Sequence, residues 1–368
     1  MARAFAADTV APNAAAWESG RTAPREALKR AADAGLCRLL ASAEAGGEQL
    51  PVGAMARIME ELSHADMAFA FALVVHNNLT GAICRRGRPD QIDRYVPDMM
   101  AGRRIGAFLL TEARGGSDAA AIATTATPDG DGWRLNGEKA WITNAAHADV
   151  LSVYAQTDAT LGWRGIAAFL VDAGQEGVIR EAPYEMLGCH ATGAGGFRFE
   201  DCKVTAGQMF VPPGEGFKAA MSGIDVARVN VAAMCAGMLR CGLETALEFT
   251  ARHQAFGAPI ADLQGLQWML ADVATDLEAS RALAYAAARA LDTGAGDAAI
   301  KAAHAKKFAT RAALARLADC MQVMGARGFR QDLPLARHMA AAKMAQYLDG
   351  TTEIQNVVIA RALLEPYR

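Results

Sequence analysis

The sequence predicts a mostly helical α+β protein with three parts: an N-terminal helical domain, a middle β-domain and a C-terminal helical bundle. Residues 1–106 are rich in Ala, Leu and Met and carry few strand signals. Residues 107–212 have the glycine punctuation and short apolar segments of β-structure, and residues 213–368 read as helix almost to the end. Helices and strands segregated in this order are typical of an α+β architecture.

The N-terminal part shows apolar residues at helical spacing from Val52 to Ala82. Its longest fully apolar run, 67–75, is too short to cross a bilayer, so no membrane partner is expected. The Ala- and Arg-rich start is interrupted by Asp8 and Glu18, which favours a first helix over a transit peptide.

The middle part is expected to form an antiparallel barrel or sandwich. Strand-like segments occur around Trp133 and at 150–154, 166–171 and 197–199. Asn136-Gly137 is a strong hairpin signal, because both positions of a type I′ turn need positive φ.

The C-terminal part begins after Pro212-Pro213-Gly214, a junction at which neither helix nor strand continues easily. Leucines recur every four residues from Leu239 to Leu247, and a second apolar stripe starts at Met234. Two stripes imply burial on more than one face, as in a helical bundle. Breaks between four or five long helices are expected at Gly257, Gly294, Gly296, Gly328 and Pro334.

Composition excludes several classes of function. A net charge of −3, with Lys and Arg spread along the chain, gives no basic patch for nucleic acid or anionic membrane. The seven cysteines are odd in number and none forms a Cys-x-x-Cys pair, which argues against a disulfide framework or a zinc cluster. We therefore expect no metal site and a reducing, cytoplasmic location.

Two segments in the middle part could serve a ligand. In 110–118, two glycines beside a serine would let backbone amides approach a ligand, although a surface turn has the same composition. In 136–144, Trp141 and Thr143 would share one strand face, where they could cover and hydrogen-bond a planar ring. A tryptophan on a strand is also common as plain core.

Two further segments lie near the C-terminus. The glycines of 322–329 end a helix and open a loop. In 347–355, Asp349 precedes a glycine and two threonines. This carboxylate is either a reactive group or the N-cap of the helix that follows.

Together and in order, these segments resemble the acyl-CoA dehydrogenase family over nearly the whole chain. The likeness extends to 165–171, 225–228, Phe256-Gly257 and the pair Gln264 and Gln267. It implies a helical domain, a β-domain and a four-helix bundle, with FAD between the last two and partly contacted by a neighbouring subunit. It also implies a homodimer or homotetramer in fatty acid metabolism, an acyl thioester of CoA or of a carrier protein as substrate, and electron-transfer flavoprotein as the acceptor.

The resemblance also implies roles for individual residues. The residues that would contact FAD are Leu110, Thr111, Gly116, Ser117, Trp141, Thr143, His253, Phe256, Gln264, Gln322, Gly325, Ala326, Thr351 and Glu353. The residues that would contact the thioester substrate are Ser117, Asp225, Arg228 and Gly350. The catalytic base would be Asp349, taking the α-proton while a hydride leaves the β-carbon for the flavin.

The chain departs from the family pattern at four positions. Asp349 stands where most members hold glutamate, so its carboxylate lies about 1.5 Å further back on an unchanged backbone. The family's alternative base position holds Ala227, which cannot take a proton. His253 stands where an arginine usually reaches the FAD pyrophosphate, and His190 also replaces a common arginine. Finally, Ala326 replaces a glycine.

Three functions stay open at this level. The first is dehydrogenation of an acyl thioester, or the reverse reduction. The second is an oxidase or monooxygenase on the same fold, since nitroalkane oxidase, a relative, also uses an aspartate base. The third is a catalytically silent flavoprotein.

Overall fold

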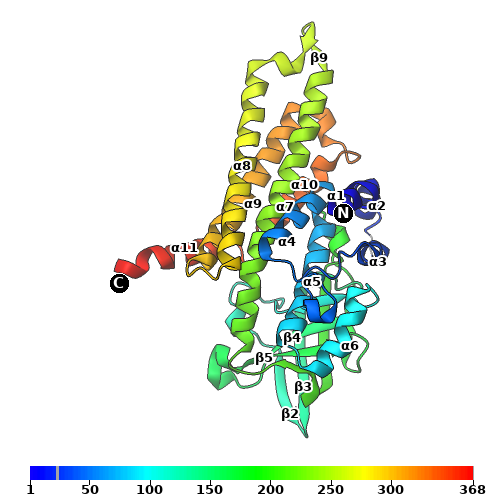
Figure 1. The fold of residues 1–368 in the computed structure, drawn as a ribbon, viewed down its shortest axis with the longest axis vertical. Coiled ribbons are helices and arrows are strands. Elements are labelled where there is room, and N and C mark those ends of the chain that lie inside the picture. Colours follow the sequence, from blue (N-terminus) through cyan, green and yellow to red (C-terminus); the bar gives the residue numbers. More distant parts are fainter. Residues whose placement is uncertain (22–24, 368) are drawn as a thin grey trace.

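The structure is a computed structural model that describes residues 1–21 and 25–367. A long helical bundle forms one end of the molecule, the β-domain forms the other end, and the N-terminal helices pack beside both (Figure 1). This arrangement confirms the three-part α+β architecture.

The N-terminal part is helical as predicted. Asp66 separates its two longest helices because the Asp66 carboxylate accepts a hydrogen bond from the Phe69 N–H at 2.8 Å and so caps the second helix. The elements are α1 (Ala2–Phe5), a π-helical turn (Ala6–Val10), α2 (Ala11–Ser19), α3 (Arg25–Asp33), α4 (Val52–Ala65), α5 (Met67–Arg86) and α6 (Pro89–Met100).

Two described helices, α5 and α7 (Gly216–Arg252), are long and apolar enough to cross a membrane by length and composition. Within their most apolar windows, 78% of α5 and 83% of α7 are buried inside the protein. Both therefore belong to the core, where α5 and α7 share one large hydrophobic cluster.

In the described residues the β-domain is one eight-stranded sheet with the strand order β6-β7-β3-β2-β4-β5-β8, and β1 pairs with β4. Most neighbours are antiparallel, but β1 and β2 each run parallel to β4. The strands are β1 (Gly106–Leu109), β2 (Thr125–Asp129), β3 (Gly132–Ile142), β4 (Val150–Gln156), β5 (Ile166–Asp172), β6 (Val178–Arg180), β7 (Gly195–Thr205) and β8 (Met209–Val211).

The hairpin predicted at Asn136-Gly137 is wrong. The β2–β3 turn lies at Gly130, and Asn136-Gly137 instead lies inside β3 at a bulge against β7. Asn136 exchanges two hydrogen bonds with Asp201, and a Cβ on Gly137 would approach the Thr124 Cα to 2.6 Å. Gly137, with φ of 140°, is therefore needed for close approach within the sheet, and not for a chain reversal.

The C-terminal part begins with α7 directly after the predicted Pro212–Gly214 junction. Its three longest helices pack on one another, and α11 projects from the bundle while contacting α9 (Figure 1). The predicted breaks at Gly257, Gly294, Gly296 and Gly328 fall between α-helices, and Pro334 is the first residue of α10. The elements are α7, the hairpin β9 (Gln254–Ala255) and β10 (Ala258–Pro259), α8 (Gln264–Asp292), α9 (Ala298–Val323), α10 (Pro334–Ala345) and α11 (Thr352–Leu364).

Candidate active site

Asp349 and Gly350 form a tight reversal between α10 and α11. Both have positive φ, 50° for Asp349 and 91° for Gly350. The cap of α11 is Thr351, whose hydroxyl accepts from the Ile354 N–H at 3.4 Å. Asp349 is therefore not the helix N-cap, which removes the structural alternative considered for this carboxylate.

Three side chains from three helices hold the main chain of this reversal. Arg228 on α7 donates from Nε to the Asp349 carbonyl at 3.2 Å. Lys306 on α9 donates to the Gly350 carbonyl at 2.8 Å, and Gln355 on α11 donates to the same oxygen at 2.8 Å. The backbone around Asp349 is thus fixed by partners that leave its carboxylate untouched.

The Asp349 carboxylate is short of partners. Its Oδ2 atom is buried and has no hydrogen-bond partner among residues 1–21 and 25–367. Burial raises the pKa of this carboxyl from 3.8 to about 6, and the nearby positive charges of Lys306 and Arg228 oppose that rise. A carboxylate with one buried, unpartnered oxygen and a pKa near neutrality suits a general base.

Asp225 and Arg228 form an ion pair of 2.8 Å, three residues apart on α7. Burial raises the pKa of Asp225, and Arg228 works against that rise. Arg228 is buried and contacts the Asp349 carbonyl, so it packs directly against the reversal. The structure therefore brings together four of the predicted residues, Asp225, Arg228, Asp349 and Gly350.

The 110–118 segment leaves β1 and is fixed by a buried ion pair that sequence analysis did not single out. Lys139 on β3 donates to Glu112 at 3.0 Å and to the Leu110 carbonyl at 3.1 Å. Burial lowers the pKa of Lys139 to about 8, against the effect of Glu112. Burial also opposes ionisation of Glu112, but Lys139 and the N–H groups of Ala123 and Thr124 outweigh it and lower its pKa to about 2.

Leu110 itself is buried, whereas Gly116 and Ser117 lie on an exposed loop. Thr111 is half-buried, and its carbonyl accepts from the Ala140 N–H at 3.0 Å, which ties this segment to β3. The predicted ligand loop is therefore open to solvent on one side and anchored to the strand that carries Trp141 on the other.

Trp141 and Thr143 do not share a strand face as predicted. β3 ends at Ile142, and Trp141 has a φ of 59° at a register shift against β7, so the alternation of side chains is broken there. Trp141 is 61% exposed, with its ring 4.6 Å from that of Tyr184. Thr143 follows the strand and is half-buried. The Trp141 indole is therefore exposed and available to a ligand. The alternation of side chains along a regular strand does not predict this orientation.

His190 lies in a loop that is held by Glu18. Its Nδ1 lies 3.0 Å from Oε1 of Glu18, and Oε2 of Glu18 accepts the His190 main-chain N–H at 3.1 Å. The loop of His190 is tied to the segment after Trp141 by a bond from the Asn144 N–H to the Thr192 carbonyl. The other ring nitrogen, Nε2, is buried and has no hydrogen-bond partner among residues 1–21 and 25–367. The contacts with Glu18 therefore hold the His190 loop in place while one ring nitrogen stays unpartnered.

A second group of predicted residues lies at the far end of the bundle. Gln322, Gly325 and Ala326 are exposed at the end of α9, and Phe256 is 96% exposed at the tip of the β9–β10 hairpin. Phe256-Gly257 forms the hairpin turn, with φ of 54° and 85°. The remaining predicted residues of this end, His253 and Gln264, are also exposed.

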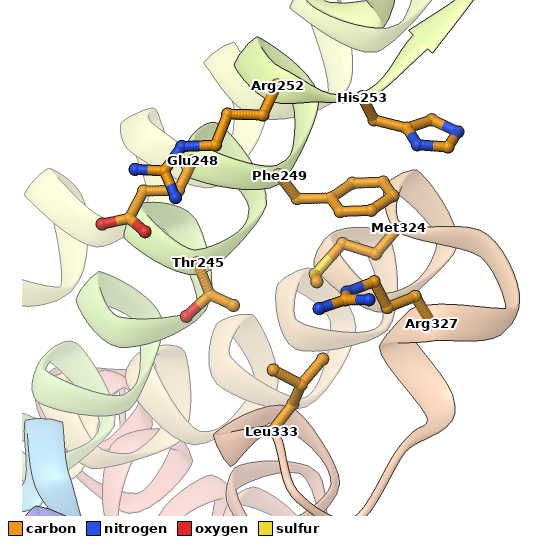
Figure 2. Close-up of a pocket in the computed structure, with 8 residues that line it drawn as sticks. All are labelled: Thr245, Glu248, Phe249, Arg252, His253, Met324, Arg327 and Leu333. Atoms are coloured by element: carbon orange, nitrogen blue, oxygen red, sulfur yellow. The ribbon is translucent and has the colours of Figure 1, made fainter.

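An open pocket of about 310 Å³ lies beside this group, between α7 and the loop that follows α9. The rings of Phe249 and His253 stack 4.8 Å apart at 16° on one side, and Met324 and Arg327 face them across the pocket (Figure 2). Arg252 borders the same space, so the pocket combines a flat aromatic surface with two guanidinium groups. Such a lining suits an aromatic base carrying phosphates.

The two groups are far apart within one chain. Arg228 and Arg252 lie 24 residues apart on the continuous helix α7, which places them about 36 Å apart along its axis. The far-end residues therefore cannot line the space around Asp349 in the same chain.

The exposed features fit a flavin nucleotide. Trp141 offers a largely exposed indole on the β-domain, and Phe256 offers an almost fully exposed phenyl ring at the far end. Built Cβ atoms on Gly115 and Gly325 would meet no described atom within 4 Å, so both loops leave room for a ligand to approach the backbone. The donors and flat surfaces needed by a ring system and a pyrophosphate are present at both ends.

Comparison with known proteins identifies the class. The chain matches sequence models of three acyl-CoA dehydrogenase domains: the N-terminal domain over residues 1–103, the middle domain over 107–202 and the C-terminal domain over 214–364. The chain therefore belongs to the acyl-CoA dehydrogenase family.

The similarity extends to whole proteins. The chain is 37% identical to the mitochondrial short-chain specific acyl-CoA dehydrogenase of Homo sapiens and 36% identical to that of Bos taurus, over 100% of this chain and 89% of each relative. The structure of butyryl-CoA dehydrogenase from Megasphaera elsdenii matches with a TM-score of 0.95 and 32% identity, over 99% of this chain and 96% of the other.

Two further matches concern the cofactor and the electron partner. A chain from a structure titled for the electron transferring flavoprotein of Acidaminococcus fermentans matches with a TM-score of 0.95 and 35% identity, over 99% of this chain and 96% of the other. The FAD complex of PigA matches with a TM-score of 0.93 and 29% identity, over 98% and 95%. The expected FAD-dependent oxidoreductase acting on a CH–CH bond of an acyl thioester is confirmed at the level of the family.

Proposed function

We propose that this protein dehydrogenates a short-chain acyl-CoA between its α- and β-carbons, with Asp349 as the base. The Asp349 carboxylate, whose Oδ2 atom is buried and has no hydrogen-bond partner among the described residues, is the observation that carries this proposal. The short chain length rests on the similarity to short-chain specific and butyryl-CoA dehydrogenases.

In this proposal Asp349 takes the α-proton of the bound thioester. The reversal that carries it is fixed by Arg228, Lys306 and Gln355, so the carboxylate can stay in place as the proton moves. The thioester carbonyl must be polarised for its α-proton to become acidic, and the main-chain N–H of Asp349 is the donor that we assign on this chain. When bound, FAD supplies the acceptor for the hydride that leaves the β-carbon.

The remaining groups have binding roles in this proposal. Trp141 and Thr143 cover the flavin ring, and the open loop at Gly116 and Ser117 contacts cofactor and substrate. Exclusion of water by the ligand would strengthen each hydrogen bond at the reacting atoms.

We further propose that the active protein is a homodimer or a dimer of dimers. The far-end residues lie about 36 Å from Arg228 along α7, so a second subunit is needed to bring them to the cofactor. The exposed side chains of Phe256 and Trp268 support an interface at this end.

Electron-transfer flavoprotein is the acceptor we propose. The similarity to a chain in an electron transferring flavoprotein structure supports it. A cytoplasmic location remains our proposal on cysteine usage alone.

The test is anaerobic mixing of the purified protein with a panel of straight, branched and dicarboxylic acyl-CoA compounds, with bleaching of the flavin as the signal. One short acyl-CoA should bleach the parent rapidly. Asp349→Asn should slow this step by about 10²–10⁴ while FAD stays bound. Asp93→Asn, a change at an exposed carboxylate on α6, is the matched control and should behave as the parent does.

Two results would contradict the proposal. Rapid bleaching by Asp349→Asn would mean that Asp349 is not the base. Oxygen consumption by the parent as fast as reduction of an added acceptor would favour the oxidase alternative.

A further inference from the structure

Lys306 occupies an unusual position for a lysine. It lies on α9 and is fully buried, on a helix face made of buried alanines such as Ala302, Ala305 and Ala309. Removing an ammonium group from water is unfavourable unless its donors and its charge find partners. The hydrogen-bond partners of the Lys306 ammonium group therefore indicate its role.

Those partners span the reversal that carries Asp349. The Lys306 ammonium donates to the carbonyl of Gln346, the residue that ends α10, at 2.9 Å. It also donates to the carbonyl of Gly350 at 2.8 Å. One ammonium group thus ties together the two ends of the short segment in which Asp349 lies.

This segment needs such support. Asp349 has a φ of 50°, in the left-handed region that residues with a Cβ avoid, and Gly350 follows with a φ of 91°. A main chain in this conformation persists only where its surroundings hold it. Arg228 on α7 contacts the Asp349 carbonyl, and Gln355 on α11 contacts the carbonyls from Asp349 to Thr351 at 2.8–3.5 Å. Lys306 is the group that also reaches the end of α10.

Lys306 also contributes charge. The charged and titratable groups that act on it are Asp349, Cys235 and Arg228, with a smaller effect from Glu353. Among the described residues it donates to main-chain carbonyls and to none of these side chains. Its positive charge lowers the pKa of Asp349, and burial lowers its own pKa to about 8, so it is mostly cationic at pH 7. The charge stabilises the carboxylate form without occupying the oxygen that must meet the substrate.

We propose that Lys306 is a positioning residue for the reaction: it holds the Asp349 reversal in its reactive conformation through two carbonyls and keeps the Asp349 carboxylate ionised through space. This inference rests on the proposed role of Asp349 as the base. It adds a residue outside the sequence motifs, on a helix that supplies no other group to this site among the described residues.

The test compares Lys306→Met, which keeps the length and apolar packing of the side chain, with Lys306→Gln, which keeps a hydrogen-bond donor but no charge. Lys307→Met, at the adjacent half-buried lysine, is the control. The measurement is the rate of flavin reduction by saturating butyryl-CoA in the FAD-loaded protein from pH 5 to pH 9. Affinity for butyryl-CoA and FAD content are measured alongside.

In the parent and in Lys307→Met, the rate should rise with a midpoint near pH 6. Loss of the positive charge raises the pKa of Asp349, so the midpoint should move to higher pH in both Lys306 variants. Displacement of the carboxylate by about 1 Å would lower the limiting rate of Lys306→Met by about 100-fold. Lys306→Gln should lose less of the limiting rate, because the amide can still bind a carbonyl.

An unchanged midpoint and limiting rate in both variants would overturn the inference and leave Lys306 a packing residue. If Lys306→Met does not fold, Lys306→Gln decides by its midpoint alone. Asp349→Asn, measured in parallel, separates the two proposals. Loss of flavin reduction in Asp349→Asn with unchanged Lys306 variants refutes only the role of Lys306. Parent-like reduction by Asp349→Asn refutes the base itself.

Discussion

Replacing Asp349 by asparagine should make the fold progressively more stable relative to the parent as the pH rises, at the same time as it removes activity. Burial raises the pKa of this carboxyl from 3.8 to about 6 in the folded protein. The unfolded chain therefore gives up this proton at lower pH than the folded protein does. The contribution of Asp349 to stability is present below pH 3.8 and is lost as the pH rises through 6.

The size of the effect follows from the shift. Two pKa units correspond to about 3 kcal/mol of destabilisation by the ionised carboxylate at pH 8. At pH 5, where the folded carboxyl is still mostly protonated, the same relation gives about 1.6 kcal/mol. Asp349→Asn never ionises, so its stability relative to the parent should improve by about 1.4 kcal/mol between pH 5 and pH 8.

The assay is urea unfolding of parent and Asp349→Asn at pH 5 and pH 8, at one protein concentration and with excess FAD, because both ligand and assembly change apparent stability. Any pH-independent change in the free energy of unfolding caused by burying the amide is the same at both pH values, so it cancels in the comparison. Asp93→Asn, at an exposed site, should show no such dependence on pH. A stability difference that is the same at both pH values would refute the pKa assigned to Asp349.

Three further predictions follow from the site. Lys139→Met should destabilise the protein by about 3–5 kcal/mol, since it leaves the Glu112 carboxylate buried without its cation, and Glu112→Gln in the same chain should restore part of the loss on thermal unfolding. His253→Arg should slow FAD release on dilution, because a charged donor makes a stronger hydrogen bond to a pyrophosphate than a neutral imidazole does; an unchanged release rate would place His253 away from the cofactor. Asp349→Glu extends the carboxylate by about 1.5 Å and should raise flavin reduction by straight-chain acyl-CoA relative to branched substrates, and equal effects on both would contradict it.

The helical parts and most strands could be predicted because their signals are local. Apolar periodicity located α5 and α7, and the glycine and proline breaks coincide with the ends of the bundle helices. The hairpin at Asn136-Gly137 failed because a turn signal is also local, whereas the actual conformation is set by pairing with β7 and by close contact with Thr124. Tertiary pairing outweighed the local preference at that point.

The site, like the fold, could be predicted from the sequence only where its signals are local. Asp349 stands out by its place before a glycine, and the structure excludes it as the helix cap because Thr351 takes the capping role. Lys306 and the Glu112–Lys139 pair were missed, because their partners lie far away in sequence. In the sequence, Lys306 and Lys307 look like two solvated lysines on a helix. Only the packing of α9 against the α10–α11 connection shows that Lys306 is buried and contacts that connection.

The length of α7 has a consequence for mixed assemblies. If the residues around Asp349 and those around His253 serve one cofactor from two different chains, each complete site is a joint product of two polypeptides. A chain disabled at the base and a chain disabled at the far end would each be inactive alone. Co-assembled, they would form some sites that draw an intact half from each parent, so two defective alleles of this protein could complement one another.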